Sequence, residues 1–537
     1  MKIKRSITLV LCLLLSACGH QAIKETDIAR QKGLLLVGIG PDPEGLDPQC
    51  VSGVTEQNVL RSLFEGLVRP DPKTSEPRPG VAISWTVSEN GLTYRFFLRQ
   101  DARWSNGDPL TTHDFVFSFQ RLLTQEIGSP SAHSFFFIKN ARQFYNKELP
   151  FEQVGVKAVN DYELDIELEQ PTPFFLSLLM MPAAYPLHRP TLKACNGEFI
   201  RDPLWTQPQN FVSNGAFKLK NWRAGKNIEV TKNEYYWDQE HVALSGIKFL
   251  PISDVATEER AFRSGQLHIT ENVPYTKIKA YHEQASSPLR IHPYFGTFYY
   301  VFNTKVQPLN NVRVRKALNL ALHREELMGC DLFQIKHKST FQLVPEGCQN
   351  FHCINPIRED AEEARRLLAE AGYPNGQGFP KLTLIFNTAQ GQTYLASAMQ
   401  EMWKKELNID IELINVEWKV YLQRRREKDF EIARGGWIGD YNDPTTFLNL
   451  WIENNPNNFT YWHNTKFEKY LRKASKEIDS QRRIHYLGKA ESLLLEECPL
   501  LPIHASATSH LVDGKVCGWY PNLLDWHPYE NISFSEE

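Results

Sequence analysis

Residues 425–451 read RREKDFEIARGGWIGDYNDPTTFLNLW and combine a strand pattern, two glycines and several functional side chains. Residues 430–433 alternate as a short β-strand does. Gly435 and Gly436 would let a second backbone approach this strand closely. Trp437 then offers a flat apolar surface, and Asp440 supplies a carboxylate just after the strand.

These groups fit an extended peptide ligand. The strand would pair with the ligand's main chain, Trp437 and Tyr441 would contact its side chains, and Asp440 would bind its terminal ammonium. The alternative is a buried strand followed by a turn at Asn442-Asp443-Pro444. The rest of the chain has to decide between the two.

Length and composition restrict the class of protein. A chain of 537 residues exceeds one hydrophobic core, so two or three lobes are expected. Hydrophobic residues make up 42% and charged residues 23%, as in an ordinary globular protein. The formal net charge is −3, and no long Lys/Arg run follows the first residues, which argues against nucleic acid as a partner.

The amino terminus has the pattern of a lipoprotein signal peptide in residues 1–17. Lys2, Lys4 and Arg5 precede an apolar stretch, and residues 15–18, LSAC, resemble the bacterial lipobox. In that motif Cys18 is diacylated and becomes the first residue of the mature chain. The alternative is an ordinary signal cleaved near Ala17.

This interpretation predicts a membrane-anchored, extracytoplasmic protein, located in the periplasm or at the cell surface. The polar residues 18–32 would form a tether between the lipid and the folded body. No later stretch reaches the roughly 18 consecutive apolar residues of a transmembrane helix.

Seven cysteines remain after residues 1–18, an odd number that leaves at least one thiol without an intramolecular partner. Cys348 and Cys353 are close enough in sequence to form a disulfide. A metal site with His337 and His352 is the alternative, but the spacing fits no zinc pattern. We therefore predict no metal site, no cofactor and no catalytic residue.

Hydrophobic patterns predict an α/β protein. Residues 33–40 indicate a buried strand, 56–67 a helix, and 85–98 a hairpin with a turn at Asn90-Gly91. Further predicted elements are a helix at 114–123 capped by Thr111 or Thr112, a helix at 361–368, and a strand–helix–strand unit within 381–416.

Several long motifs resemble the extracytoplasmic oligopeptide- and dipeptide-binding proteins of ABC importers. They are GVAISW (80–85), YRFFLR (94–99), ARWSNGDPLTTHDFVFSFQR (102–121), WTQP (205–208), NGAFKLKNW (214–222), NEYYWD (233–238), LPI (250–252), FRSGQL (262–267), VRVRKALNLAL (312–322) and AEAGY (369–373). WIGDYNDPT (437–445) looks like the oligopeptide-binding subgroup. The resemblance covers essentially the whole mature chain, in order.

The resemblance implies a three-lobed periplasmic-binding-protein fold, in which two large α/β lobes are joined by a hinge and an extra lobe is added. By analogy, lobe I takes residues 33–65, 190–293 and 505–537. Lobe II, the extra lobe, takes 66–189, and lobe III takes 294–504.

The resemblance also implies the residues that contact a ligand. They are Ser52, Gly53, Val54, Tyr299, Trp418, Arg425, Arg434, Gly436, Trp437, Ile438 and Asp440. Residues 52–54 and 436–438 would be two strands that flank the peptide, and Asp440 would bind its ammonium; a turn-capping acid is the alternative for Asp440. A hydrogen bond to such a charged group contributes about 1.5–3 kcal/mol.

The remaining side chains would line pockets for the ligand. Arg425 and Arg434 would meet acidic side chains or the ligand's carboxylate, although Arg425 could instead belong to a solvated basic face. Trp418 and Tyr299 would be aromatic walls, with core packing as the alternative.

The chain departs from the family pattern at several pocket positions. A family cysteine pair falls on Gly296 and Ile438, so that disulfide is absent. Other family pocket residues, a tyrosine, an acid, a base and a histidine, fall on Ser131, Val301, Leu332 and Gln392. The preferred length and side chains of a peptide are therefore not implied.

The expected function is capture of short peptides by lobe closure, followed by delivery to an ABC permease, by a monomeric protein that is not an enzyme. The alternative is an extracytoplasmic sensor or a binder of cell-wall (murein) peptides. A peptidase has no support, because the chain contains neither HExxH nor GxSxG.

Overall fold

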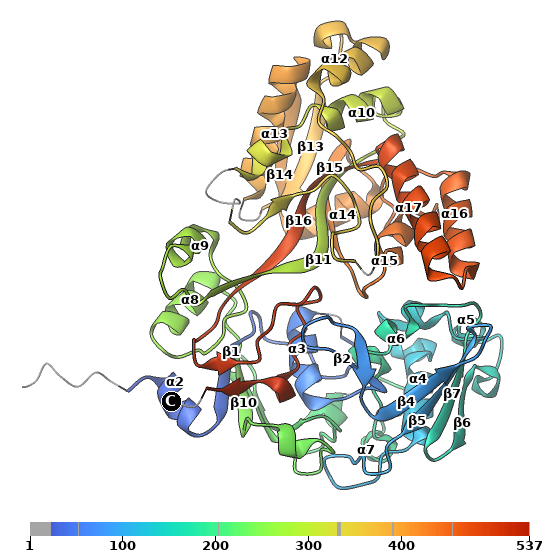
Figure 1. Ribbon diagram of the computed structural model, residues 1–537, viewed down its shortest axis with the longest axis vertical. Helices are drawn as coiled ribbons and strands as arrows, with labels where there is room; N and C mark the ends of the chain where they lie inside the picture. The colour runs from blue at the N-terminus through green and yellow to red at the C-terminus, as the bar shows by residue number, and fades with distance from the viewer. Residues whose placement is uncertain are drawn as a thin grey trace, which may run out of the picture.

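The computed structural model describes residues 23–51, 53–201, 203–329, 335–348, 350–388, 391–453 and 455–535. The predicted signal peptide, Cys18 and Ser52 lie outside these ranges. Three β-sheets organise the described chain, and we call the parts built around them lobes I, II and III (Figure 1).

Lobe I contains a four-stranded sheet in the order β1-β10-β9-β8, with β1 parallel to β10. Its strands are β1 (Leu34–Gly38), β8 (Phe217–Arg223), β9 (Asn227–Lys232) and β10 (Gly246–Leu250). Its helices are α2 (Glu25–Gln31), α3 (Val54–Leu63), α7 (Arg189–Ala194), α8 (Val255–Arg263) and α9 (Tyr275–His282), and β17 (Val516–Cys517) pairs with β18 (Ser533–Phe534). The predicted strand at 33–40 is confirmed as β1, because its apolar run is buried between neighbours.

The predicted tether is wrong over residues 25–31, which form α2. The amide of Thr26 donates to the carbonyl of Gly265 at 2.9 Å, and Ala29 is buried against the body. Although the segment is polar in composition, one face of α2 is buried, and the segment therefore belongs to lobe I.

Lobe II contains an antiparallel sheet in the order β4-β5-β7-β6. The strands are β4 (Ala82–Val87), β5 (Thr93–Leu98), β6 (Val156–Asn160) and β7 (Glu163–Glu167), and the small ribbon is β2 (Val68–Pro70) and β3 (Pro77–Pro79). The helices are α4 (Thr112–Leu122), α5 (Ala141–Tyr145) and α6 (Phe175–Leu178). The predicted hairpin is confirmed by the β4–β5 pairing, and Thr111 caps α4 in a capping box with Asp114.

Lobe III contains a six-stranded sheet in the order β12-β16-β11-β15-β13-β14. The strands are β11 (Leu289–Phe302), β12 (Lys338–Ser339), β13 (Leu382–Asn387), β14 (Ile411–Val416), β15 (Ile432–Ile438) and β16 (Leu500–Leu511). The helices are α10 (Val312–Leu320), α11 (Arg324–Met328), α12 (Ala361–Glu370), α13 (Gln392–Leu407), α14 (Trp418–Glu427), α15 (Thr445–Leu448), α16 (Thr465–Lys476) and α17 (Ser480–Glu497). The predicted strand–helix–strand unit is confirmed as β13-α13-β14, with parallel strands.

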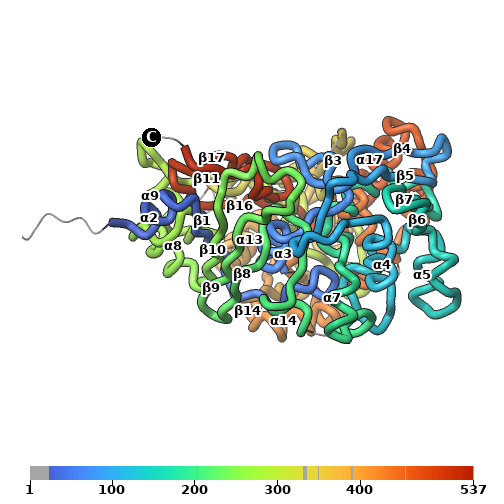
Figure 2. The backbone as a smooth tube through the Cα atoms, turned by 90° about the horizontal axis from the view of Figure 1, so that it is seen from below, coloured from blue at the N-terminus to red at the C-terminus, as the bar shows by residue number. Residues whose placement is uncertain are grey.

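The long strands β11 and β16 run between lobe I and lobe III (Figure 1). Their antiparallel ladder is interrupted between Pro293 and Thr297, next to the predicted lobe boundary at 293/294. Figure 2, seen from below, shows the sheets of lobes I and II side by side. Among the described residues, no helix combines the length and apolar character needed to span a membrane.

Candidate functional site

One edge of β15 is only partly covered. On one side β15 pairs with β11 along its whole length, from Ile432 opposite Phe302 to Ile438 opposite Gly296. On the other side β13 pairs only with Ile432 and Ala433. Within the described chain, no strand pairs with this second edge beyond Ala433.

The direction of the backbone groups shows which residues face the open edge. In an antiparallel strand the N–H and C=O of one residue point to the same side, and successive residues alternate. The carbonyl of Arg434 points away from β11, because it accepts a hydrogen bond from the Tyr421 hydroxyl on α14. Gly436 and Ile438 therefore present their backbone groups to the open edge, as pairing with an extended ligand requires.

Asp440 lies two residues beyond β15, and its carboxylate has no hydrogen bond or ion pair with any described residue. Its amide donates to the Thr446 hydroxyl at 3.1 Å. The residue is exposed at the surface, but the surrounding protein removes enough water to raise the pKa of its carboxyl to about 6. A carboxylate without a partner is prepared to receive a cation.

The loop after Asp440 is held by a buried ion pair that sequence reasoning missed. The two terminal guanidinium nitrogens of Arg483, on α17, donate to the carboxylate of Asp443, at 2.8 and 2.9 Å. Thr445 donates its amide and its hydroxyl to the same carboxylate. The predicted turn at 442–444 is thus fixed from outside, and the position of Asp440 with it.

A small cavity of about 20 Å³ lies against one face of β15. Its walls are Tyr299, Val301, Arg425, Gly435, Gly436, Trp437, Leu450, Trp451, Asn457, Phe459 and Thr460. Gly435 is required here, because a Cβ at this position would lie 2.6 Å from the Tyr299 ring. The structure therefore brings together four of the predicted site residues, Tyr299, Arg425, Gly436 and Trp437.

Arg425 is the one charged side chain among these lining residues. It lies over the Phe459 ring, 4.5 Å from the centroid, and has no carboxylate partner in the described chain. Arg424 instead pairs with Asp429 at 2.9 Å. The neighbouring arginines 424 and 425 therefore differ, since Arg425 lines the cavity and Arg424 forms a surface ion pair.

Arg434 lies on the opposite face of β15 from this cavity. Its guanidinium sits over the Phe298 ring at 5.1 Å, and burial lowers its pKa. It too lacks an acidic partner among the described residues. The two predicted pocket arginines therefore serve different sides of the strand.

Two predictions about the site's margins are only partly met. Residues 53–54 are not a strand: Gly53 is extended, but its carbonyl accepts from the Gln57 amide, and Val54 begins α3. The Gly53 carbonyl, which strand pairing would use, is therefore already bonded within the first turn of α3. Trp418, at the start of α14, is 44% exposed, stacks on Tyr421 and does not line the cavity.

The predicted family departures have physical consequences. Ile438 occupies the space above Gly296, where a Cβ would lie 2.3 Å from its Cδ1. Val301 lines the cavity, so no acid there neutralises Arg425. Cys353 has a free thiol, so the suggested disulfide between Cys348 and Cys353 is wrong.

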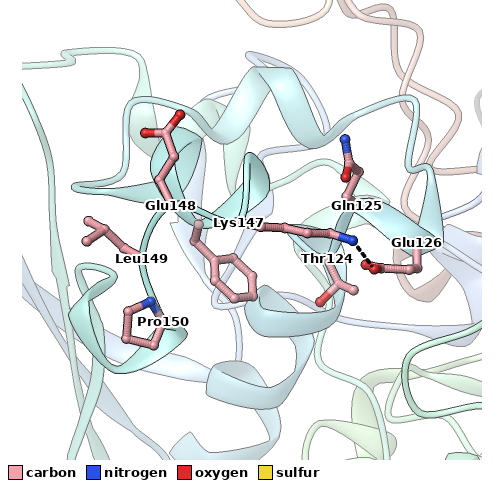
Figure 3. A pocket seen from close by; sticks show the side chains of 8 residues that line it. Thr124, Gln125, Glu126, Lys147, Glu148, Leu149 and Pro150 are labelled. Carbon is pink, nitrogen blue, oxygen red and sulfur yellow. Dashed lines mark hydrogen bonds and ion pairs between the residues drawn. The ribbon is translucent and has the colours of Figure 1, made fainter.

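A second hollow, on lobe II, offers less to a ligand (Figure 3). It is lined by Thr124, Gln125, Glu126, Phe144, Lys147, Glu148, Leu149 and Pro150. Lys147 already pairs with Glu126, and the hollow is broadly open to water. Its ion pair leaves little unmatched charge for recognition, unlike the cavity at β15.

With this geometry in place, comparison with known proteins identifies the class. Residues 76–459 match the family described as bacterial extracellular solute-binding proteins, family 5, middle. The chain therefore belongs to the family 5 extracellular solute-binding proteins, whose mixed α/β fold it has.

Particular relatives agree along nearly the full length. The periplasmic oligopeptide-binding protein OppA of Salmonella typhimurium is 33% identical over 500 residues, which are 91% of this chain and 90% of that protein. The oligopeptide-binding protein OppA of Bacillus subtilis is 32% identical over 536 residues, 96% and 95% of the two chains. The solved structure of the Escherichia coli murein tripeptide binding protein MppA is 32% identical, with a TM-score of 0.79, covering 94% of this chain and 99% of that one.

Proposed function

We propose that this protein is a lipid-anchored extracytoplasmic receptor that captures short peptides by lobe closure and delivers them to an ABC importer. The observation that carries the proposal is the open edge at Gly436 and Ile438, followed two residues later by a carboxylate without a partner. The edge supplies main-chain hydrogen bonds that every peptide can use, and Asp440 supplies the counter-charge of an α-ammonium. Such a site holds peptides without reading their sequence.

Side chains would be accommodated next to this edge. In the proposal, Trp437 and Tyr299 form aromatic walls, and Arg425 in the cavity meets an acidic side chain or the ligand's carboxylate. Arg434 acts from the other face, Trp418 at the margin, and residues 52–54 approach from lobe I. The predicted lobe boundaries, the monomeric state and the anchor at Cys18 are parts of the same proposal.

A second candidate is a binder of murein peptides that is not committed to nutrient import. Its support is the similarity to the murein tripeptide binding protein over 94% of the chain. A murein peptide carries extra carboxylates, which Arg425 and Arg434 could meet.

Native mass spectrometry of protein expressed without residues 1–18 and never denatured tests both candidates. A ladder of added masses that fragment as ordinary short peptides is expected. Added masses that contain diaminopimelate would move the function to murein peptides. A protein that neither carries a peptide nor shifts with any peptide pool would contradict the proposal.

A further inference from the structure

A cluster of histidines lies at the lobe I end of the two long strands β11 and β16. His292 is on β11, while Asp525 and His527 belong to the C-terminal segment after β17. One possible metal-binding atom from each of these three residues lies within 4.8 Å of the other two. Nothing in their spacing along the chain indicates such a group, because the fold alone brings position 292 to the C-terminal segment.

His292 is the unusual member. It is 5% exposed, and neither of its ring nitrogens forms a hydrogen bond with a described residue. A buried polar atom without a partner costs about 1–3 kcal/mol. The His292 imidazole lies beside the imidazole of His527 and the carboxylate of Asp525. Because its own nitrogens form no hydrogen bonds with described residues, His292 can coordinate a cation without losing any.

The other two residues are held in position. The ring of His527 stacks on Trp519 with centroids 3.6 Å apart, and its Nε2 lies 2.9 Å from Asp525 Oδ1. A tetrahedral zinc ion with ligand distances of about 2.0–2.2 Å separates its ligand atoms by roughly 3.3–3.6 Å. Small side-chain rotations would open that space.

The carboxylate is supported by neighbours, as metal-binding carboxylates are. Thr508, opposite His292 in the β11–β16 ladder, donates its hydroxyl to Asp525 Oδ1 at 3.1 Å. His510 approaches the same carboxylate through Nε2 at 3.2 Å, and its Nδ1 donates to the Thr270 carbonyl. These contacts keep Asp525 turned toward the histidines.

Asp525 and His527 border a small cavity of about 10 Å³, which has room for about one water molecule. Glu271, His510, Trp519, Asp525 and His527 are among its walls. Three protein ligands beside such a cavity leave a fourth coordination position for water.

We propose that His292, Asp525 and His527 form a binding site for one divalent transition-metal ion of the Zn²⁺ type. Two imidazoles and one carboxylate are the donors that such ions prefer. The ion would join the crossover strand β11 to the C-terminal segment and so stabilise the base of the hinge.

Zinc binding to chelator-treated, purified protein tests the proposal by calorimetry and by metal analysis after dialysis. One Zn²⁺ per chain is expected, with a rise in Tm on loading. His292→Gln and His527→Gln should each weaken binding at least tenfold. His463→Gln, a change of an exposed histidine in lobe III, is the matched control and should bind zinc as the wild type does.

X-ray absorption of the zinc-loaded wild type supplies a readout that needs no variant. Two imidazoles and oxygen ligands per zinc would support the site, even where a variant fails to fold. Sulfur ligands, binding that survives both histidine changes, or no binding at micromolar zinc would overturn it.

Discussion

The ring of Phe174 in lobe II stacks on the ring of Tyr441 in lobe III, with centroids 4.5 Å apart and an angle of 9° between their planes. Both side chains are buried. Tyr441 directly follows Asp440, and the Arg483 guanidinium that holds Asp443 lies 5.9 Å from the Phe174 ring. The contact between the lobes therefore meets the loop that carries the proposed ammonium-binding residue.

We predict that Phe174 and Tyr441 are energetically coupled. A double-mutant cycle with Phe174→Leu and Tyr441→Leu should give a coupling of about 0.5–1.5 kcal/mol in the free energy of unfolding. Each single change should also lower peptide affinity, by roughly twofold to tenfold, because the loop loses its packing. Chemical denaturation and calorimetry measure the two effects.

The pair Phe144 and Phe151, within lobe II, serves as the control cycle because its rings meet edge to face at 5.3 Å. Coupling in stability without a change in peptide affinity is expected there. Additive effects at Phe174 and Tyr441 would mean that the stacked rings do not join the lobes.

Asp440→Asn should weaken peptide binding at least tenfold, since the charge-assisted hydrogen bond that it removes is worth about 1.5–3 kcal/mol. Stability at pH 7 should stay the same or rise, because the carboxylate has no partner among the described residues. Asp101→Asn, an exposed change in lobe II, is the control. Unchanged affinity for N-terminally free peptides in calorimetry would remove the assigned role.

Peptide affinity should also depend on pH through Asp440. The surrounding protein desolvates its carboxyl and raises the pKa from the ordinary 3.8 to about 6, so the folded protein binds a proton more readily than the unfolded chain does. The ionised carboxylate thus costs stability above pH 6, and this cost is lost as the pH falls toward 3.8. Binding behaves oppositely, because an ammonium needs the ionised form.

Affinity should therefore fall below pH 6, by up to about tenfold per pH unit at the limiting slope. The Asp440→Asn variant separates this effect from other titrating groups, since it should lack that part of the decline. Identical pH profiles for the two proteins would exclude Asp440 as the titrating group.

Local patterns explain which features could be predicted from the sequence. The location of Asp440 just after a strand could be predicted, because the strand pattern, the two glycines and the turn are contiguous in the chain. The partial coverage of β15 could not be predicted, because it depends on where β13 stops pairing with it. The same limit applies to Arg483, which lies forty residues from Asp443 and gives no sign of its partner.

Competition between local structures explains the failures. The amide of Gln57 takes the Gly53 carbonyl for the first turn of α3, so the segment predicted to flank a peptide begins a helix instead. Residues 25–31 read as a polar tether, but Thr26 and Ala29 lie on one helix face that packs against lobe I. Short segments reveal such burial only in their tertiary context.

Arg483→Lys should destabilise the protein by about 1–3 kcal/mol, because lysine keeps the positive charge but cannot form the buried bidentate pair with Asp443. Arg482→Lys, at a neighbouring exposed position, should change stability little. Thermal unfolding measures both. Peptide affinity of the folded Arg483→Lys protein should also fall, because the loop at 440–446 loses its anchor; equal stability of the two variants would refute the anchoring role.

In the register of β11 and β15, Gly296 lies directly opposite Ile438. The backbone N–H and C=O of Ile438 point to the open edge, so Gly296 and Ile438 do not hydrogen-bond to each other. Cα atoms of such a non-hydrogen-bonded pair lie about 4.5 Å apart. That spacing is within the range of a disulfide. The double variant Gly296→Cys/Ile438→Cys should therefore oxidise spontaneously and resist thermal unfolding more than its reduced form.

The stability gain should be smaller than the usual 2–4 kcal/mol, since a Cβ at position 296 would also meet the Trp437 carbonyl oxygen at 2.9 Å and the Ser506 hydroxyl at 2.8 Å. Thiol titration and peptide mapping measure the bond, and Gly296→Cys/Trp437→Cys is the control that places the second sulfur on the opposite face of β15. A bond in the control but none between 296 and 438 would show that the strands pair one residue out of the observed register.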